Sequence, residues 1–139
     1  MRDPAQTIGN LIDHQSTALI ASVDANGFPN VKAMGAPAKR EGIRTFYWHT
    51  NSPSMRVVQY RENPKACIYF FDKRFGARGV QLLGTMEVID DIDVKRGLWR
   101  DEFSVYYTGG ADGGDFIVLK FTAVSGRYYT KFKSENFEV

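Results

Sequence analysis

The chain has 139 residues, 43% of them hydrophobic, with 18 basic and 16 acidic side chains and a formal net charge of +2. This length and composition predict one folded domain over residues 1–139 and exclude a chain that is disordered throughout. The small net charge argues against a dedicated nucleic-acid-binding protein, because such proteins are usually far more basic. The lone Cys67 cannot close an intramolecular disulfide and no apolar run could span a membrane, so we expect a cytoplasmic protein without membrane contact.

The first predicted elements are a short helix and a β-hairpin. The helix is expected from Pro4 to about His14, because Asp3 can cap it, proline suits a first turn, and the apolar residues that follow recur at helical spacing. The hairpin is expected to pair residues 17–23 with residues 29–36. A segment of Asp, Asn and Gly between them supplies the turn.

The middle of the chain predicts two apolar strands separated by a helix. Residues 45–49 and 66–72 are dense in aromatic and β-branched side chains, as expected of strands packed inside a barrel or sandwich. The helix is expected to begin near Ser52-Pro53. It should end before Asn63, because the residue that precedes a proline is disfavoured in a helix.

The remaining elements complete the predicted fold class. They are a strand at 80–89, a helix at 91–103, a glycine-rich loop at 109–114 and two strands at 116–123 and 127–132, with a turn at Ser125-Gly126. About seven strands and three short helices, in an order that never alternates strictly, predict a mainly β protein. We therefore expect an antiparallel barrel with peripheral helices.

No catalytic residues can be assigned from motifs. The chain has only His14, His49 and one cysteine, which do not predict a metal site. The glycine-rich loop matches no phosphate-binding motif, and the carboxylates of Asp112 and Asp115 in and beside it would repel a phosphate.

One segment has the features of an anion site. It runs from an aromatic strand into the start of a helix and contains Thr50, Asn51, Ser52, Ser54 and Arg56. Helix N-termini attract anions, and these hydroxyl and amide groups can add hydrogen bonds. A cation in a first helical turn opposes the macrodipole by about 0.3 to 1 kcal/mol, a conflict that a bound dianion would remove. The alternative interpretation is a capped helix with a solvated arginine.

Lys32 is a second candidate for anion binding. In an extended strand, Lys32 and Met34 face one side while Val31 and Ala33 face the other. A role for Lys32 requires that its face come close to the Thr50–Arg56 segment, so that two basic groups bracket one phosphate. Otherwise the lysine is simply solvated.

Aromatic residues make up 14% of the chain and leave several functions open. They could fill a core, form a dimer contact or stack on a planar ligand. On a barrel, stacking aromatics with scattered basic residues would also suit single-stranded nucleic acid. The residues concerned are Tyr47, Trp48, Trp99, Tyr106, Tyr107, Tyr128 and Tyr129.

The order of these signals resembles a known family. Three segments carry the likeness: residues 21–34, which include Gly27-Phe28-Pro29 and Lys32-Ala33-Met34, residues 46–56, which read FYWHTNSPSMR, and Asn63-Pro64-Lys65-Ala66. Together they resemble the pyridoxamine 5'-phosphate oxidase-like split barrels that bind FMN, and most closely the general stress protein 26-like branch. The likeness extends from about Ile8 to Tyr129.

The resemblance implies an antiparallel split β-barrel that forms a homodimer with FMN at the subunit interface. The FMN phosphate would be held by Lys32 and by the Thr50–Arg56 segment, and the backbone of Ala33 and Met34 would lie along the flavin ring. Tyr128 or Tyr129 would approach the flavin from the partner subunit. Family members more often have Arg-Pro-Met where this chain has Lys32-Ala33-Met34, which replaces a bidentate phosphate contact with a point charge.

The resemblance also implies an activity, a flavin-dependent oxidoreductase acting on a small substrate or electron donor. Full pyridoxamine phosphate oxidases carry an arginine and a histidine near the C-terminus for their substrate, whereas this chain has no histidine after His49. We therefore do not expect the vitamin-processing reaction. The alternative is a non-catalytic module that holds a flavin, haem or other planar ligand, or that acts by interaction alone.

Overall fold

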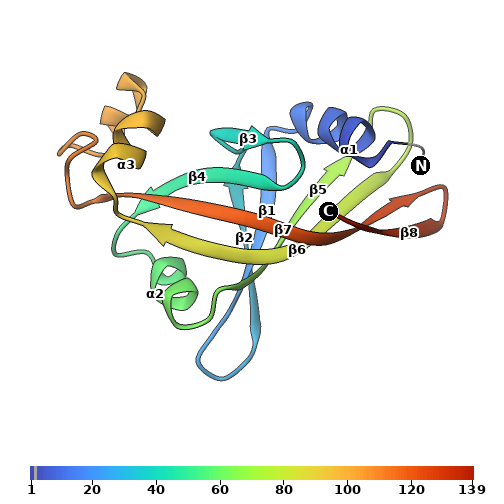
Figure 1. Ribbon diagram of the computed structural model, residues 1–139, viewed down its shortest axis with the longest axis horizontal. Helices are drawn as coiled ribbons and strands as arrows, with labels where there is room; N and C mark the ends of the chain where they lie inside the picture. The colour runs from blue at the N-terminus through green and yellow to red at the C-terminus, as the bar shows by residue number, and fades with distance from the viewer. Residues whose placement is uncertain (2) are drawn as a thin grey trace.

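The computed structural model describes Met1 and residues 3–139, and within them the chain forms one antiparallel sheet of eight strands with helices around it (Figure 1). The strand order is β2-β1-β5-β6-β7-β4-β3, with β8 paired to β7, and β2 and β3 lie at the two ends, so the barrel is split rather than closed. The helices are α1 (Pro4–Asp13), α2 (Met55–Glu62) and α3 (Ile92–Leu98), followed by the short 3-10 helix η1 (Asp101–Val105). The strands are β1 (Thr17–Val23), β2 (Pro29–Gly35), β3 (Lys39–Glu41), β4 (Thr45–Asn51), β5 (Lys65–Asp72), β6 (Arg78–Ile89), β7 (Phe116–Thr130) and β8 (Lys133–Glu138). This confirms the predicted mainly β, antiparallel split barrel.

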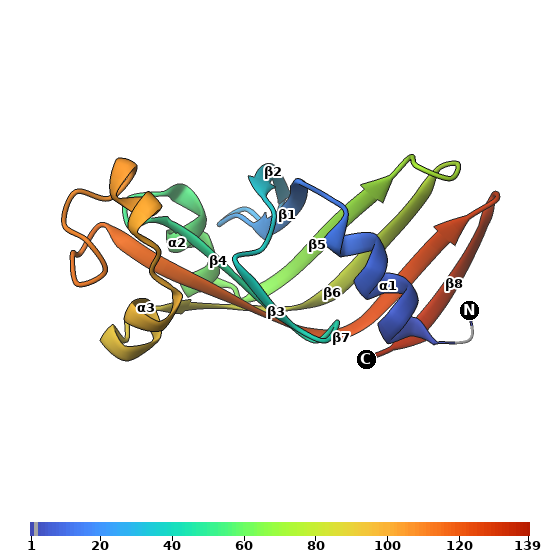
Figure 2. The same cartoon turned by 90° about the horizontal axis from the view of Figure 1, so that it is seen from above.

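The core lies on the inner face of the sheet, where alternate residues of β1 and β4 are buried together with residues of β5, β6 and β7. Phe46, Phe70 and Phe121 come from three different strands. The ring centroid of Phe46 lies 6.3 Å from that of Phe70 and 6.2 Å from that of Phe121. The apolar stripe of α1 joins the same cluster, with Ile8 and Leu11 fully buried. In Figure 2, α1 lies over the concave side of the sheet, between β5 and β8. The predicted first helix is confirmed, with Asp3 as its N-cap.

The predicted turn at Ser125-Gly126 is wrong, because β7 continues through it to Thr130. Gly126 is needed for close packing instead: a Cβ atom there would lie 2.4 Å from Phe137 and 2.8 Å from Leu82. The hairpin turn comes later, at Lys131 and Phe132, which both have positive φ angles (50° and 64°). Neither residue is a usual turn former, so no local pattern marks this turn.

Three other boundaries differ from the predictions. The two predicted C-terminal strands form one strand, and β3 and β8, which were not predicted, bring the number to eight. The predicted helix at 91–103 is interrupted because Trp99 and Arg100 are extended, with ψ angles of 139° and 143°, so α3 ends and η1 begins. The helix expected near Ser52 begins at Met55, with Ser54 as its N-cap.

Among the described residues, no helix combines the length and the apolar character needed to cross a bilayer.

Candidate functional site

The candidate site lies between the β1–β2 hairpin and α2, beside the split that separates β2 from β4. Lys32 of β2 and Arg56 of α2 line one cavity of about 160 Å³ there, although 23 residues separate them in the sequence. β2 lies at one end of the sheet and pairs only with β1, whereas α2 directly follows β4. The sheet order therefore brings the two candidate cations to one place. The other lining residues are Ile20, Ser22, Asn30, Val31, Met55 and Gln59.

Arg56 is a partly buried cation without an anionic partner among the described residues. Its Nη2 donates a hydrogen bond to Thr50 Oγ1 at 3.2 Å, while its Nε is buried and has no partner among the described residues. Burial lowers the pKa of Arg56, although the hydroxyls of Tyr60 and Tyr107 act in the opposite direction. No carboxylate in the described part of the chain forms a salt bridge with it. A buried donor without an acceptor typically costs about 1 to 3 kcal/mol, so an anion in this cavity would relieve a real cost.

The other residues of the predicted anion segment divide into two groups. Thr50 is buried and contacts Arg56 directly. Ser54 caps α2, because its hydroxyl accepts a hydrogen bond from the Val57 backbone N–H. The backbone N–H of Ser52 donates to the carbonyl oxygen of Asp115 at 3.0 Å. None of Thr50, Asn51, Ser52 and Ser54 lines the cavity with Lys32 and Arg56.

Sequence reasoning missed three polar residues of this cavity, Ser22, Asn30 and Gln59. Gln59 lies three residues after Arg56 and therefore shares its face of α2, a spacing that could have identified it. The buried Ser22 hydroxyl donates a hydrogen bond to the Gln59 side-chain oxygen. Ser22 pairs with Asn30 in the hairpin register, which places it beside the cavity. No local signal marks Ser22, because its role depends on β1 lying against α2.

A second, larger cavity of about 470 Å³ adjoins the same split. It lies next to the continuation of β2, because Met34 projects on the same side of the strand as Lys32. The predicted alternation in β2 thus places the two cavities one after the other along it. The lining residues are Met34, Gly35, Ala36, Trp48, His49, Glu102, Phe103 and Tyr106.

His49 is the imidazole group of this second cavity. Its ring centroid lies 4.2 Å from that of Phe103, and its Nδ1 lies 2.8 Å from the hydroxyl of Tyr107. Burial lowers the pKa of His49, and the positive charge of Arg100 adds to the effect. Burial likewise raises the pKa of Tyr107 to about 12. Near neutral pH, therefore, two uncharged rings share this hydrogen bond.

The predicted aromatic contacts lie elsewhere in this subunit. Tyr128 is 8% exposed and belongs to the core, whereas Tyr129 points to the opposite face of the sheet. Both lie near the end of β7 that pairs with the start of β6, while the other end of β7 pairs with Asn51. Neither tyrosine lines the two cavities along β2. Trp99 and Tyr107 pack with Phe103 in a second core cluster.

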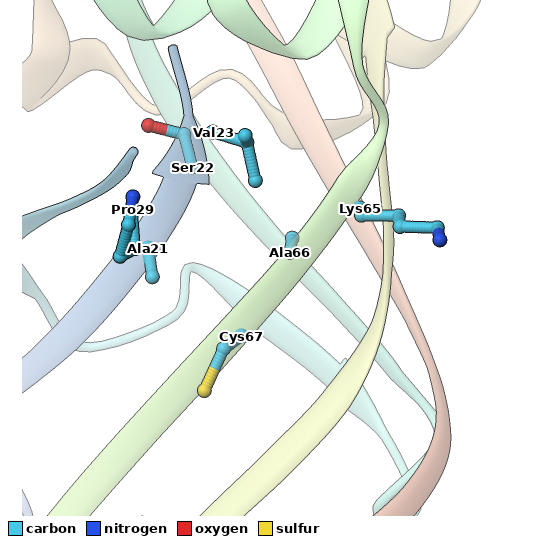
Figure 3. Close-up of a pocket in the computed structure, with 7 residues that line it drawn as sticks. All are labelled: Ala21, Ser22, Val23, Pro29, Lys65, Ala66 and Cys67. Atoms are coloured by element: carbon cyan, nitrogen blue, oxygen red, sulfur yellow. The ribbon is translucent and has the colours of Figure 1, made fainter. Parts of the chain in front are cut away.

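The outer face of the sheet is apolar and exposed. The strand register places Val31, Ala21, Cys67 and Leu83 side by side across β2, β1, β5 and β6. A shallow apolar cavity of about 210 Å³ lies on this part of the sheet, with lining residues on β1, the start of β2 and β5 (Figure 3). The pKa of the Cys67 thiol is raised by burial, so the thiol stays protonated and unreactive. We call Leu19, Val31, Phe71 and Leu83, which are all exposed, the outer apolar face.

Comparison with known families and structures is consistent with this geometry. The sequence profile of the family described as pyridoxamine 5'-phosphate oxidase matches residues 5–130. A comparison with curated proteins finds no match.

Solved structures share the fold over almost the whole chain. A protein from Clostridium acetobutylicum, related to general stress protein 26 of B. subtilis and of the pyridoxinephosphate oxidase family, is 34% identical with a TM-score of 0.86, covering 98% of this chain and 94% of that one. General Stress Protein 26 from Bacillus anthracis is 16% identical with a TM-score of 0.77, covering 97% and 98%. A heme binding protein from Mycobacterium smegmatis is 14% identical with a TM-score of 0.77, covering 98% of this chain and 58% of that one. The last two likenesses concern the fold alone.

Proposed function

Because the chain belongs to the pyridoxamine 5'-phosphate oxidase family, whose members usually bind flavin, we propose that it binds FMN in the split between β2 and β4. The observation that carries this proposal is the partly buried Arg56, which has a buried, unpaired Nε and lines a cavity with Lys32. Two cations around one small cavity require an anion, and a phosphate dianion matches both the charge and the size.

Three residues of this cavity would contact the phosphate in different ways. Arg56 would donate from the part of its guanidinium that lines the cavity, while the hydrogen bond from its Nη2 to Thr50 Oγ1 keeps the group oriented. Lys32 would supply a second positive charge from the opposite wall. Gln59, held by Ser22, would add its amide as an uncharged partner. Hydrogen bonds in a half-buried site are stronger than in water, because the local dielectric is lower.

The flavin ring would extend from this cavity along β2 toward the larger one. β2 pairs with β1 on one side only, so its other backbone edge faces the split and can bond the polar edge of a planar ligand. This is the expected position of Ala33 and Met34. Trp48 and Phe103 in the larger cavity offer aromatic surface to the same ligand.

The outer apolar face supports a homodimer. Leu19, Val31, Phe71 and Leu83 are exposed on one side of the sheet, and such a contiguous apolar patch is typical of a protein interface. Tyr129 projects on this face and Tyr128 does not, so Tyr129 is the tyrosine that would reach a partner. A Leu19→Glu change should convert a dimer to a monomer in analytical ultracentrifugation, while Phe28→Glu, at an exposed hairpin turn, should not. A monomeric unmodified protein would contradict this part.

The proposed activity is that of an oxidoreductase acting on a small molecule or electron donor. FMN, when bound, supplies the hydride or electron transfer. The chain itself contributes the larger cavity, where uncharged His49 and the carboxylate of Glu102 can orient a substrate through hydrogen bonds.

The direct test compares FMN with riboflavin, which lacks the phosphate. The Arg56→Ala protein should bind FMN about 1.5 to 3 kcal/mol more weakly, roughly 10- to 150-fold, and should lose most of its preference over riboflavin. Arg61→Ala, which removes an exposed arginine from the same helix, is the matched control. Flavin fluorescence quenching measures both. Equal FMN affinity of the Arg56→Ala and unmodified proteins would refute the assignment.

A non-catalytic module for a planar ligand is the second candidate. His49, half-buried in the larger cavity, is a residue that can ligate haem iron, although its Nδ1 is already bonded to Tyr107. The absorbance spectrum separates the two functions. A haem-type band that disappears in a His49→Ala variant would favour the module, and flavin bands bleached by NAD(P)H would favour the oxidoreductase.

A further inference from the structure

A polar cavity of about 560 Å³ lies between α1 and the beginning of β6, away from the proposed flavin site. Its lining residues are Gln6, Thr7 and Asn10 of α1 and Arg78 of β6. Figure 2 shows α1 close to where β6 begins and α2 close to where it ends, so the two sites occupy opposite ends of the barrel. This cavity is therefore independent of Lys32 and Arg56.

The charges beside this cavity do not balance. Arg74 and Arg78 both form salt bridges with the carboxylate of Asp72, which is 1% exposed. Hydrogen bonds from Arg74, together with that from Arg78, hold the pKa of Asp72 far below its usual range, so the carboxylate is ionised. Two guanidinium groups and one carboxylate leave one positive charge in excess. Within the described residues, no second carboxylate forms a salt bridge with either arginine.

Arg78 also has an unused hydrogen-bond donor. Its Nη2 is bonded to Asp72, but its Nε is buried and has no partner in the part of the chain that the structure describes. Only Arg56 and Arg78 have such an orphaned atom there. The side chain of Arg78 is 17% exposed, so it opens to the cavity while remaining largely desolvated.

The opposite wall is rich in uncharged polar groups. Gln6, Thr7 and Asn10 occupy one face of α1, and their side chains form no hydrogen bond with other described residues. Two amides and a hydroxyl can donate to and accept from a ligand without adding negative charge. The walls thus combine one excess positive charge with several free donors, a combination that selects for an anion.

We propose that this cavity binds the carboxylate or phosphate group of a small organic molecule, with Arg78 as the principal contact. The anionic group accepts from the part of the Arg78 guanidinium that opens to the cavity, and the remainder of the molecule lies against Gln6, Thr7 and Asn10. The volume of this cavity, about 560 Å³, is well above the 160 Å³ of the cavity proposed for the flavin phosphate. It therefore has room for an organic group beside the anionic one.

The experiment uses inorganic phosphate and acetate as probes of the two anion classes. Both are titrated against the full chain at constant ionic strength in an Arg56→Ala background, which removes the other phosphate site. NMR follows the Nε–Hε signals of the arginines. The Arg78 signal should shift saturably with at least one probe, while that of Arg96, a surface arginine paired with Asp112, should stay in place. A linear, unsaturated drift of both signals with both probes would overturn the proposal.

Variants provide a second measurement. Asn10→Ala removes an exposed side-chain amide that forms no hydrogen bond with other described residues. It should weaken binding of the probe several-fold without changing the melting temperature. Arg78→Gln should abolish saturable binding, and Arg96→Gln should leave it unchanged. If Arg78→Gln fails to fold, the Asn10→Ala comparison decides alone, and an unchanged affinity there contradicts the proposal. Because Arg56 is absent throughout, failure here leaves the flavin proposal untouched.

Discussion

Trp48 donates a hydrogen bond from its indole Nε1 to the carbonyl oxygen of Gly35, 2.9 Å away, across the split in the barrel. The sheet itself does not join these strands, because β2 pairs only with β1 and β4 pairs with β3 and β7. Trp48 is 2% exposed whereas Gly35 is exposed, so the bond is partly buried. It therefore holds β2 and β4 at a defined separation beside the larger cavity, of which both residues are part.

Trp48→Phe should lower the free energy of unfolding by about 1 to 3 kcal/mol, because it removes this bond and leaves a small void. Chemical denaturation measures the change. Trp99→Phe is the control, since Trp99 is only partly buried and forms no hydrogen bond from its indole within the described chain. If Trp48→Phe lowers the free energy of unfolding no more than Trp99→Phe does, the hydrogen bond across the split does not stabilise the fold.

Lys32→Arg should strengthen FMN binding by about threefold to tenfold, or roughly 1 kcal/mol. A guanidinium can contact two phosphate oxygens at once, whereas an ammonium acts as a point charge. The backbone of an extended strand tolerates either residue. Lys65→Arg, an exposed position on β5, should leave the affinity unchanged. Weaker binding by Lys32→Arg would place the phosphate away from this side chain.

Stability should fall as the pH is lowered from about 7 to 5, with His49 as the cause. Burial, assisted by Arg100, lowers the pKa of His49 in the folded chain below its ordinary value of 6.5. The unfolded chain therefore binds a proton that the folded chain does not, and acidification through this range favours unfolding. The aspartates with lowered pKa values, such as Asp72, act only below about pH 4.

His49→Gln removes the titrating ring and should flatten this part of the stability profile. Urea midpoints across the pH range provide the measurement. His14→Gln serves as the control, because His14 is exposed at the end of α1. If the His14 variant flattens the profile and the His49 variant does not, the assignment is wrong.

Gly84→Ala should destabilise the fold by about 1 to 3 kcal/mol. Gly84 lies where the β6–β7 register shifts, and a Cβ atom there would lie 2.0 Å from the backbone oxygen of Thr122. Backbone cannot move aside as a side chain can. Gly114→Ala is the matched change, because a Cβ atom meets nothing within 4 Å there. Thermal melting of both variants tests the difference, and equal melting temperatures would refute it.

Several parts of the fold were predictable because their signals are local. Asp3 and Pro4 mark the start of α1 through capping and backbone chemistry alone. The hairpin turn before β2 was equally clear, since Asp24 accepts backbone hydrogen bonds and Gly27 has a φ angle of 84°. The turn at Lys131-Phe132 could not be predicted, because its positive φ angles are held by the β7–β8 pairing and not by residues that favour such angles.

The residue types of the candidate site could be recognised before folding was considered: a lysine on the second strand, and a threonine and an arginine flanking a helix start. That Lys32 and Arg56 share a cavity follows from the folded arrangement, because it depends on the order of strands in the sheet. The folded arrangement also separated Ser54, which is committed to a helix cap, from Thr50, which contacts Arg56. The Arg78 cavity had no local signal, since its walls come from a helix and a strand nearly seventy residues apart. Propensities and caps act over a few residues, whereas cavities and charge balance arise only where distant segments pack.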